Sequence, residues 1–184
     1  MHSLMTSDRI ILCAVEQDDA NFMWHVETDS SQWIHNCMAA PLSKESLYCY
    51  ALSYDANPYS AGQLRLIIWK NEHGKATQRI GIIDLYEISA QHHTAFVGIY
   101  ILPSLRRKGY AMDALRIICN YSLRCLNLRQ LGARIVSDNS GCISLFEKVG
   151  FRQCGVLLNW IQSGNRFFDL HMFQKALDSS LNEA

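Results

Sequence analysis

A chain of 184 residues usually folds as one domain, and 49% hydrophobic against 18% charged residues is the composition of an ordinary globular protein. The 17 basic and 17 acidic side chains balance to zero, so there is no overall attraction to nucleic acid or an anionic membrane. The first residues lack a signal-peptide pattern, and no apolar run approaches the roughly 20 residues of a membrane helix. We expect a single domain over residues 1–184, without membrane or nucleic-acid partners, whose polar tail at 176–184 is frayed.

The seven cysteines are scattered, odd in number and contain no Cys-x-x-Cys pair. This usage is typical of reduced, packed thiols, and it predicts a cytoplasmic protein. The seven histidines show no metal-ligand spacing, so we expect no metal site.

Hydrophobic periodicity and turn residues predict elements in the order β-α-α-β-β-β-α-β-α-β-β, which indicates an α/β (α+β) protein with a mixed sheet covered by helices. The first helix follows Asp18 and Asp19, the segment 30–42 is irregular with Trp33 and Ile34 buried, and Asn57-Pro58 breaks the second helix. The strands are expected at 9–15, 64–69, 79–88, 95–102, 133–137, 156–161 and 166–173, and the later helices at 43–54, 109–126 and 141–149.

Strict alternation along the strand 79–88 assigns its side chains to two faces of the sheet. It places Ile83, Leu85 and Glu87 on one face. The other face is expected to carry Ile80, Ile82, Asp84, Tyr86 and Ile88.

The stretch from Phe96 to Ala111 organises the chain. Its first part, up to Leu102, is apolar or glycine throughout, as in a central strand covered on both faces, and Pro103 ends it. A basic run with one glycine then opens a long amphipathic helix. Backbone amides at a helix start beside three cations form a site for phosphate, although a solvated basic turn would show the same residues. The residues are Arg106, Arg107, Lys108, Gly109, Tyr110 and Ala111.

This phosphate loop lacks the second glycine and the Lys-Ser/Thr of a P-loop, and it lacks the G-x-G-x-x-G of a dinucleotide fold. Its Arg-x-x-Gly-x-Ala pattern resembles motif A of the GNAT superfamily of acyl-CoA-dependent N-acyltransferases. A second stretch resembles motif B of that family: Asn139, Glu147, Lys148, Gly150 and Phe151 match, while Cys142 and Phe146 replace the usual Ser and Tyr.

The resemblance extends from Arg9 to about Gln174, and it is greatest to the branch of spermidine/spermine and ribosomal-protein N-terminal acetyltransferases. It implies a GNAT fold, with a mostly antiparallel sheet of six to seven strands and helices on both faces. It also implies an enzyme that uses acetyl-CoA as co-substrate and acts on a small-molecule amine or a peptide N-terminus. A homodimer is common in that branch.

By the same resemblance, the backbone amides from Arg107 to Ala111 hold the pyrophosphate of acetyl-CoA, and the side chains of residues 106–108 add charge. Ile99 and Ile101 bind the pantetheine arm through their backbones, beside a bulge at Gly98 that opens the thioester slot. Asn139 reaches the pantetheine, although capping its helix explains it equally well. Phe146 occupies the motif B position beside the cofactor.

Acetyl transfer needs a neutral amine, so a general base is expected, and Glu87 and Asp84 are the candidates. Both could equally be ordinary surface charges. The amide of Ile99 could hold the oxyanion. The acceptor site is expected between the two N-terminal helices and the turn 163–165. Its acids would include Glu27, Asp29, Glu45 and Asp55.

Two departures from the family pattern bear on activity. Phe146 has no proton to give to the departing thiolate, which leaves a catalytically weak acyl-CoA sensor or partner-binding module as the alternative function. The sequence Ala95-Phe96-Val97 lacks the acid found there in several polyamine acetyltransferases, and this weakens a polyamine assignment.

Overall fold

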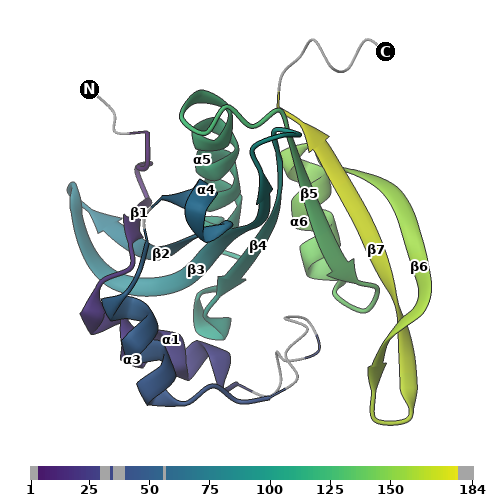
Figure 1. The fold of residues 1–184 in the computed structure, drawn as a ribbon, viewed down its shortest axis with the longest axis horizontal. Helices are drawn as coiled ribbons and strands as arrows, with labels where there is room; N and C mark the ends of the chain where they lie inside the picture. Colours follow the sequence, from purple (N-terminus) through teal and green to yellow (C-terminus); the bar gives the residue numbers. More distant parts are fainter. Residues whose placement is uncertain (1–3, 30–33, 35–39, 56, 178–184) are drawn as a thin grey trace.

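The computed structural model describes residues 4–29, 34, 40–55 and 57–177, and these form one seven-stranded sheet flanked by helices (Figure 1). The strand order is β1-β2-β3-β4-β5-β7-β6, and only β4 and β5 are parallel. The elements are β1 Ile10–Ala14, α1 Ala20–Glu27, α3 Lys44–Leu52, α4 Pro58–Ala61, β2 Gln63–Glu72, β3 Lys75–Ser89, β4 Thr94–Ile101, α5 Tyr110–Arg124, β5 Gln130–Val136, α6 Ser140–Val149, β6 Arg152–Ser163 and β7 Arg166–Ala176. The predicted fold class is confirmed, and the order of elements is as predicted except for the additional short helix α4.

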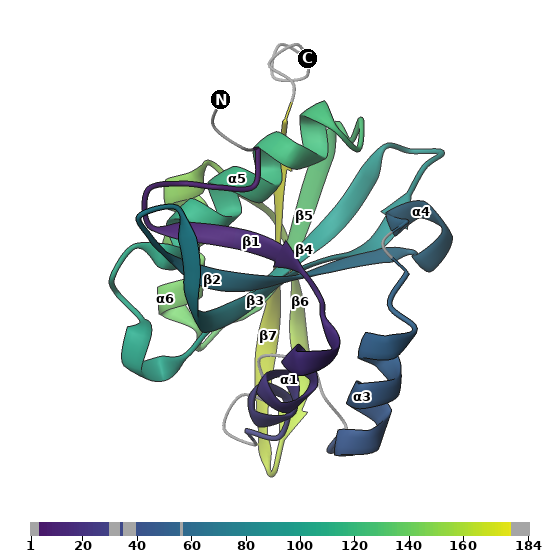
Figure 2. The same ribbon diagram turned by 90° about the vertical axis from the view of Figure 1, so that its left-hand side faces the viewer.

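Helices cover both faces of this sheet, as Figures 1 and 2 show. On one face, α5 and α6 pack on the sheet through a large apolar cluster that includes Leu115, Ile118 and Phe146. On the other face, α1 and α3 form a smaller cluster with β2 and β3, centred on Met23 and Ile67. Each face of the sheet is therefore covered by its own pair of helices and its own apolar cluster.

The alternation predicted for β3 is wrong at both of its ends, because the strand contains two bulges. Ile80 is an extra residue in the register with β2, and it lies in the large cluster with Ile83 and Leu85. A second irregularity follows Tyr86, and it brings Ile88 to the same cluster. Ile82 lies in the smaller cluster, so it does not share a face with Ile80 and Ile88 as expected.

Helix ends follow the capping residues of the sequence. The Ser43 hydroxyl accepts a hydrogen bond from the Ser46 amide at the start of α3, and Gly150 ends α6 with a φ of 95°. Asn57 was expected to break a helix, but its side chain caps the one-turn helix α4 instead. Trp33 lies outside the described residues, and Ile34 is half-buried.

The strands β6 and β7 form a long hairpin that extends away from the body of the sheet in Figure 1. Fraying was expected from residue 176, but Ala176 is the last residue of β7 and the amide of Leu177 donates to the carbonyl of Arg129. Residues 178–184 lie outside the described part. In the part described, no helix has both the length and the apolar character needed to cross a bilayer.

Candidate active site

The parallel strands β4 and β5 are paired over only three residues each. The register runs from Thr94 with Gln130 to Phe96 with Gly132, and the ladder then ends although both strands continue. Figure 1 shows the two strands diverging from this point. The expected separation is present, but the bulge expected at Gly98 is not, because Gly98 sits in regular register with Asp84 of β3.

The backbone of β4 offers hydrogen-bonding groups toward this separation. The amide of Leu102 donates to the carbonyl of Ile80 in β3, and backbone groups alternate sides along a strand. Residues 98 and 100 therefore face β3, and the main-chain groups of Ile99 and Ile101 face the side where β5 has diverged. The Ile101 carbonyl already accepts a hydrogen bond from Nε of Arg106 at 3.0 Å, so Ile99 retains the greater capacity for a ligand.

The loop after β4 ends in a helix start with unpaired amides. Arg107 and Gly109 have φ angles of 63° and 86°, and α5 begins at Tyr110. Among the described residues, no carbonyl or side chain accepts a hydrogen bond from the amides of residues 107–112. Such amides at the positive end of a helix dipole form an anion site.

The three cations of the loop do not act alike. Arg106 turns back toward β4, with its guanidinium carbon 5.5 Å from the ring centroid of Tyr100. Arg107 and Lys108 are exposed, and neither has an ion-pair partner in the described part of the chain. Two of the three predicted charges are therefore available to an anion, and the third is engaged with the strand.

Arg9, which the sequence analysis did not assign to the site, reaches this loop from the residue before β1. Its Nε and Nη2 donate to the two carboxylate oxygens of Asp113 at 2.8 Å each, and its Nη1 donates to the carbonyl of Lys108 at 3.0 Å. About a hundred positions separate these residues in the sequence, so spacing could not reveal the contact. One signal in the sequence was Asp113. A carboxylate in the first turn of a helix that is expected to bind an anion suggests that a cation lies nearby to compensate its charge.

Asp84 is half-buried and fully engaged in an ion pair. Arg65 donates to its two oxygens from Nε and Nη2 at 2.8 and 2.9 Å, and to Glu27 from Nη1 at 2.8 Å. Burial acts to lower the pKa of Arg65, but the two carboxylates outweigh it and hold that pKa above its ordinary value. Two of the expected acidic residues thus share a single guanidinium, on the α1–α3 face of the sheet.

Glu87 lies at the bulge of β3 with a φ of 50°. Both of its carboxylate oxygens bind the guanidinium of Arg134 on β5, at 2.6 and 2.8 Å, and its side chain is 54% exposed. The hydrogen bond from Arg134 lowers the pKa of Glu87, which makes its carboxylate a weaker base. The structure therefore separates the two base candidates, since they sit in different ion pairs.

The motif B residues lie on α6. The Asn139 side chain caps α6 by accepting a hydrogen bond from the Cys142 amide at 3.2 Å, which confirms the capping alternative and leaves its amide nitrogen available. Phe146 is only 2% exposed and packs edge-on against Phe151, with ring centroids 4.9 Å apart. A ring this deep in the core has almost no surface to offer a ligand, and the placement of Phe146 beside the cofactor stays a prediction.

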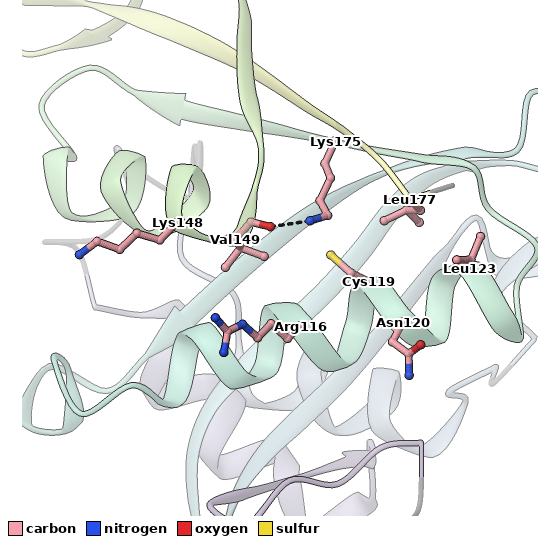
Figure 3. A pocket seen from close by; sticks show the side chains of 8 residues that line it. All are labelled: Arg116, Cys119, Asn120, Leu123, Lys148, Val149, Lys175 and Leu177. Carbon is pink, nitrogen blue, oxygen red and sulfur yellow. Dashed lines mark hydrogen bonds between the residues drawn. The ribbon is translucent and has the colours of Figure 1, made fainter. Parts of the chain in front are cut away.

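A separate hollow of about 360 Å³ lies between the C-terminal halves of α5 and α6, away from the amides of the loop (Figure 3). Lys175 donates to the carbonyl of Val149 there, so it satisfies the negative end of α6. The remaining lining residues are Arg116, Cys119, Asn120, Leu123, Lys148 and Leu177. Of its three cations, Lys175 binds this helix end and Lys148 lies in the last turn of α6.

The described residues contain no group of three metal-ligating side chains, and all six of their cysteines are free thiols. Cys37 lies outside the described part. Burial raises the pKa of Cys119 to about 11 and that of Cys142 to about 12, so both thiols are poor nucleophiles at neutral pH.

The family model for the acetyltransferase (GNAT) domain matches residues 9–152, which is most of the chain. The chain belongs to the GNAT acetyltransferase family. The predictions of its family and of an N-acetyltransferase enzyme are thereby confirmed.

The relatives include uncharacterized N-acetyltransferases and also spermidine N(1)-acetyltransferases, which belong to the expected branch. An uncharacterized N-acetyltransferase of Bacillus subtilis, YoaA, is 23% identical over 94% of this chain and 96% of its own length. The spermidine N(1)-acetyltransferase of Vibrio cholerae is 28% identical over 61% of this chain and 72% of its own length. A crystal structure of spermidine N-acetyltransferase from Vibrio cholerae, in complex with CoA and spermine, superposes with a TM-score of 0.83 at 22% identity, covering 96% of this chain and all of that one.

Proposed function

We propose that this N-acetyltransferase binds acetyl-CoA between the diverging strands β4 and β5 and transfers the acetyl group directly to a primary amine. The observation that carries the proposal is the run of unpaired amides at residues 107–112, next to the exposed side chains of Arg107 and Lys108. These groups suit a pyrophosphate. The pantetheine would extend along β4, with its amides facing the main chain of Ile99, and Asn139 could donate to it from the other side.

The amine would approach from the α1–α3 face, because α5 and α6 cover the opposite face of the sheet. A polyamine or diamine is the proposed acceptor, and a peptide N-terminus is the alternative. Relatives named spermidine N(1)-acetyltransferases support the first. The pairing of Glu27 and Asp84 with Arg65 reduces the negative charge offered to a polycationic acceptor, and one net negative charge remains there.

In the proposed reaction the neutral amine attacks the thioester carbonyl, the carbonyl oxygen gains negative charge beside the Ile99 amide, and CoA leaves as thiolate. Asp84 is the better-placed candidate for the base, and to take the amine proton it would have to release a hydrogen bond from Arg65. Asp84 is in register with Gly98, next to Ile99, whereas the pKa of Glu87 is lowered by Arg134. No acid is assigned to the thiolate, because Phe146 has none to give and a thiolate leaves without one at neutral pH.

The test is CoA release from acetyl-CoA against spermidine, spermine, putrescine, aminoglycosides and short peptides with free N-termini. Saturable turnover with one class would establish both the reaction and the acceptor. A rise in melting temperature with acetyl-CoA, without release by any amine, would favour an acyl-CoA sensor. No binding of acetyl-CoA would refute the assignment of the loop. With the acceptor known, Asp84→Asn should lower kcat by about 100-fold or more, the usual contribution of a general base.

A further inference from the structure

Arg9 links the first strand to the loop that is proposed to bind pyrophosphate. All three of its guanidinium nitrogens are engaged, two with Asp113 and one with the carbonyl of Lys108. The guanidinium lies so close to Gly109 that a Cβ at that position would come within 2.5 Å of Nη1. Arg9 therefore packs against the loop, and three of its five N–H donors are committed to Asp113 and Lys108.

The contact with Asp113 removes an electrostatic conflict. Asp113 lies in the first turn of α5, and its side chain is only 12% exposed. A carboxylate there stabilises the empty helix but repels a phosphate at the same amides. The bidentate pair with Arg9 compensates this charge at the site where the anion would bind.

The contact with Lys108 sets the direction of a peptide group. Its carbonyl points at Arg9 Nη1, and in a trans peptide the following N–H points the opposite way. The amide of Gly109 is therefore turned away from Arg9. It joins the unpaired amides of the helix start, and Gly109 permits the left-handed φ of 86° that this turn requires.

We propose that Arg9 is a positioning residue for acetyl-CoA, because it neutralises Asp113 and fixes the Lys108–Gly109 peptide so that the loop can receive the pyrophosphate. The inference rests on the proposed function of the loop. It assigns a role in binding acetyl-CoA to the residue before the edge strand β1, about a hundred positions before the loop in the sequence. Arg9 is not proposed to touch the acetyl-CoA.

The experiment compares two acetyl donors in the full-length protein: acetyl-CoA, and S-acetylpantetheine, which has the thioester arm but no pyrophosphate. Arg9→Met should raise the KM for acetyl-CoA about tenfold or more and leave the KM for S-acetylpantetheine within twofold. Arg9→Lys keeps the charge but cannot make all three contacts, so an intermediate rise is expected. Arg124→Met removes the same charge from the other end of α5 and should leave both values unchanged.

The double variant separates the two parts of the role. Asp113→Asn alone should bind acetyl-CoA about twofold more tightly, because a negative charge is lost near the phosphate. Combined with Arg9→Met, it should recover the electrostatic part of the defect, about threefold in KM. The rise in KM that remains in the double variant would measure the effect of releasing the Lys108–Gly109 peptide from its contact with Arg9.

The outcomes are distinguishable. Wild-type protein that neither binds nor uses acetyl-CoA would refute the proposed function itself. If wild type uses acetyl-CoA and Arg9→Met is unaffected, the inference about Arg9 is refuted. Equal losses with both donors, accompanied by a fall in melting temperature that Arg9→Lys shares, would show a merely structural role and would also overturn it.

Discussion

The two sides of the sheet differ in whether their polar groups already have hydrogen-bond partners. On the proposed cofactor side, the loop before α5 presents backbone amides at residues 107–112 that have no partner in the described structure. On the proposed acceptor side, Arg65 donates three short hydrogen bonds, one to Glu27 and two to Asp84. Unpaired amides at a helix end can donate hydrogen bonds to a ligand, whereas charged side chains that already pair with one another mainly stabilise the fold.

This contrast predicts different responses to substitution. Changes on the acceptor side should cost stability first, because they leave buried charges without partners. Changes in the loop should cost acetyl-CoA affinity first, because its amides contribute little to the folded state without a ligand. The variants below test that division, and the largest expected effect comes first.

Arg65→Met should lower the free energy of unfolding by about 3 kcal/mol or more, since it leaves Glu27 and Asp84 close together without their shared cation. Glu27 is only 9% exposed as a side chain, so water cannot replace the guanidinium fully. Urea denaturation at pH 7 measures the loss. The instability should lessen at acidic pH, where the two carboxylates can take up protons.

Asp84→Asn is the matched control for that experiment, because the pair between Glu27 and Arg65 stays intact. It should cost clearly less than Arg65→Met. If both variants lose less than about 1 kcal/mol, the network is an ordinary surface ion pair and the contrast between the two sides fails.

The backbone conformation of the loop before α5 could be predicted from sequence because its features are local. A strand, a proline, a glycine and a helix start lie within a short segment, and each has a direct backbone consequence. The ion pairs could not be predicted, because Arg65 meets Glu27 and Asp84 only after α1, β2 and β3 have packed together. The same reason hid Arg9, whose partner Asp113 lies on another element.

Gly109→Ala should weaken acetyl-CoA binding by about 100-fold, which corresponds to about 2.7 kcal/mol. The added Cβ would strain a backbone with a φ of 86° and collide with the Arg9 guanidinium. Isothermal titration calorimetry measures the affinity. Gly74→Ala is the control, because Gly74 has a nearly identical φ of 84° but open space around its Cβ. It should lose about 1 kcal/mol of stability and keep its affinity, and equal losses of affinity in both would contradict the assigned role of the loop.

Phe146→Tyr tests whether a family-like tyrosine restores an acid. The ring is 2% exposed and packed against Phe151, so the new hydroxyl would be buried without a partner. The free energy of unfolding should fall by about 1–2 kcal/mol, with no gain in kcat. A rise in kcat would show instead that this ring faces the thioester when acetyl-CoA is bound, as the family resemblance implies.

The fold itself followed from periodicity, except where the strand β3 departs from it. Two bulges reassign Ile80 and Ile88 to the face of Ile83, because each inserts a residue that has no counterpart on the neighbouring strand. A bulge cannot be detected from the alternation of side chains in β3, since its residues are apolar on both faces of the sheet. The second bulge also sets the position of Glu87, which is why its role could not be derived from the sequence.

Glu87→Gln should have the smallest effect, and its pH dependence makes it informative. Because Arg134 lowers the folded-state pKa of Glu87, the ion pair contributes stability above the ordinary carboxyl range and loses it as the pH falls through the folded pKa. The side chain is 54% exposed, so the difference from wild type at pH 7 should stay below about 1 kcal/mol. That difference should vanish in acid. Because the Arg134 pair weakens this carboxylate as a base, kcat/KM should change by less than about threefold, whereas a loss near 100-fold would move the base from Asp84 to Glu87.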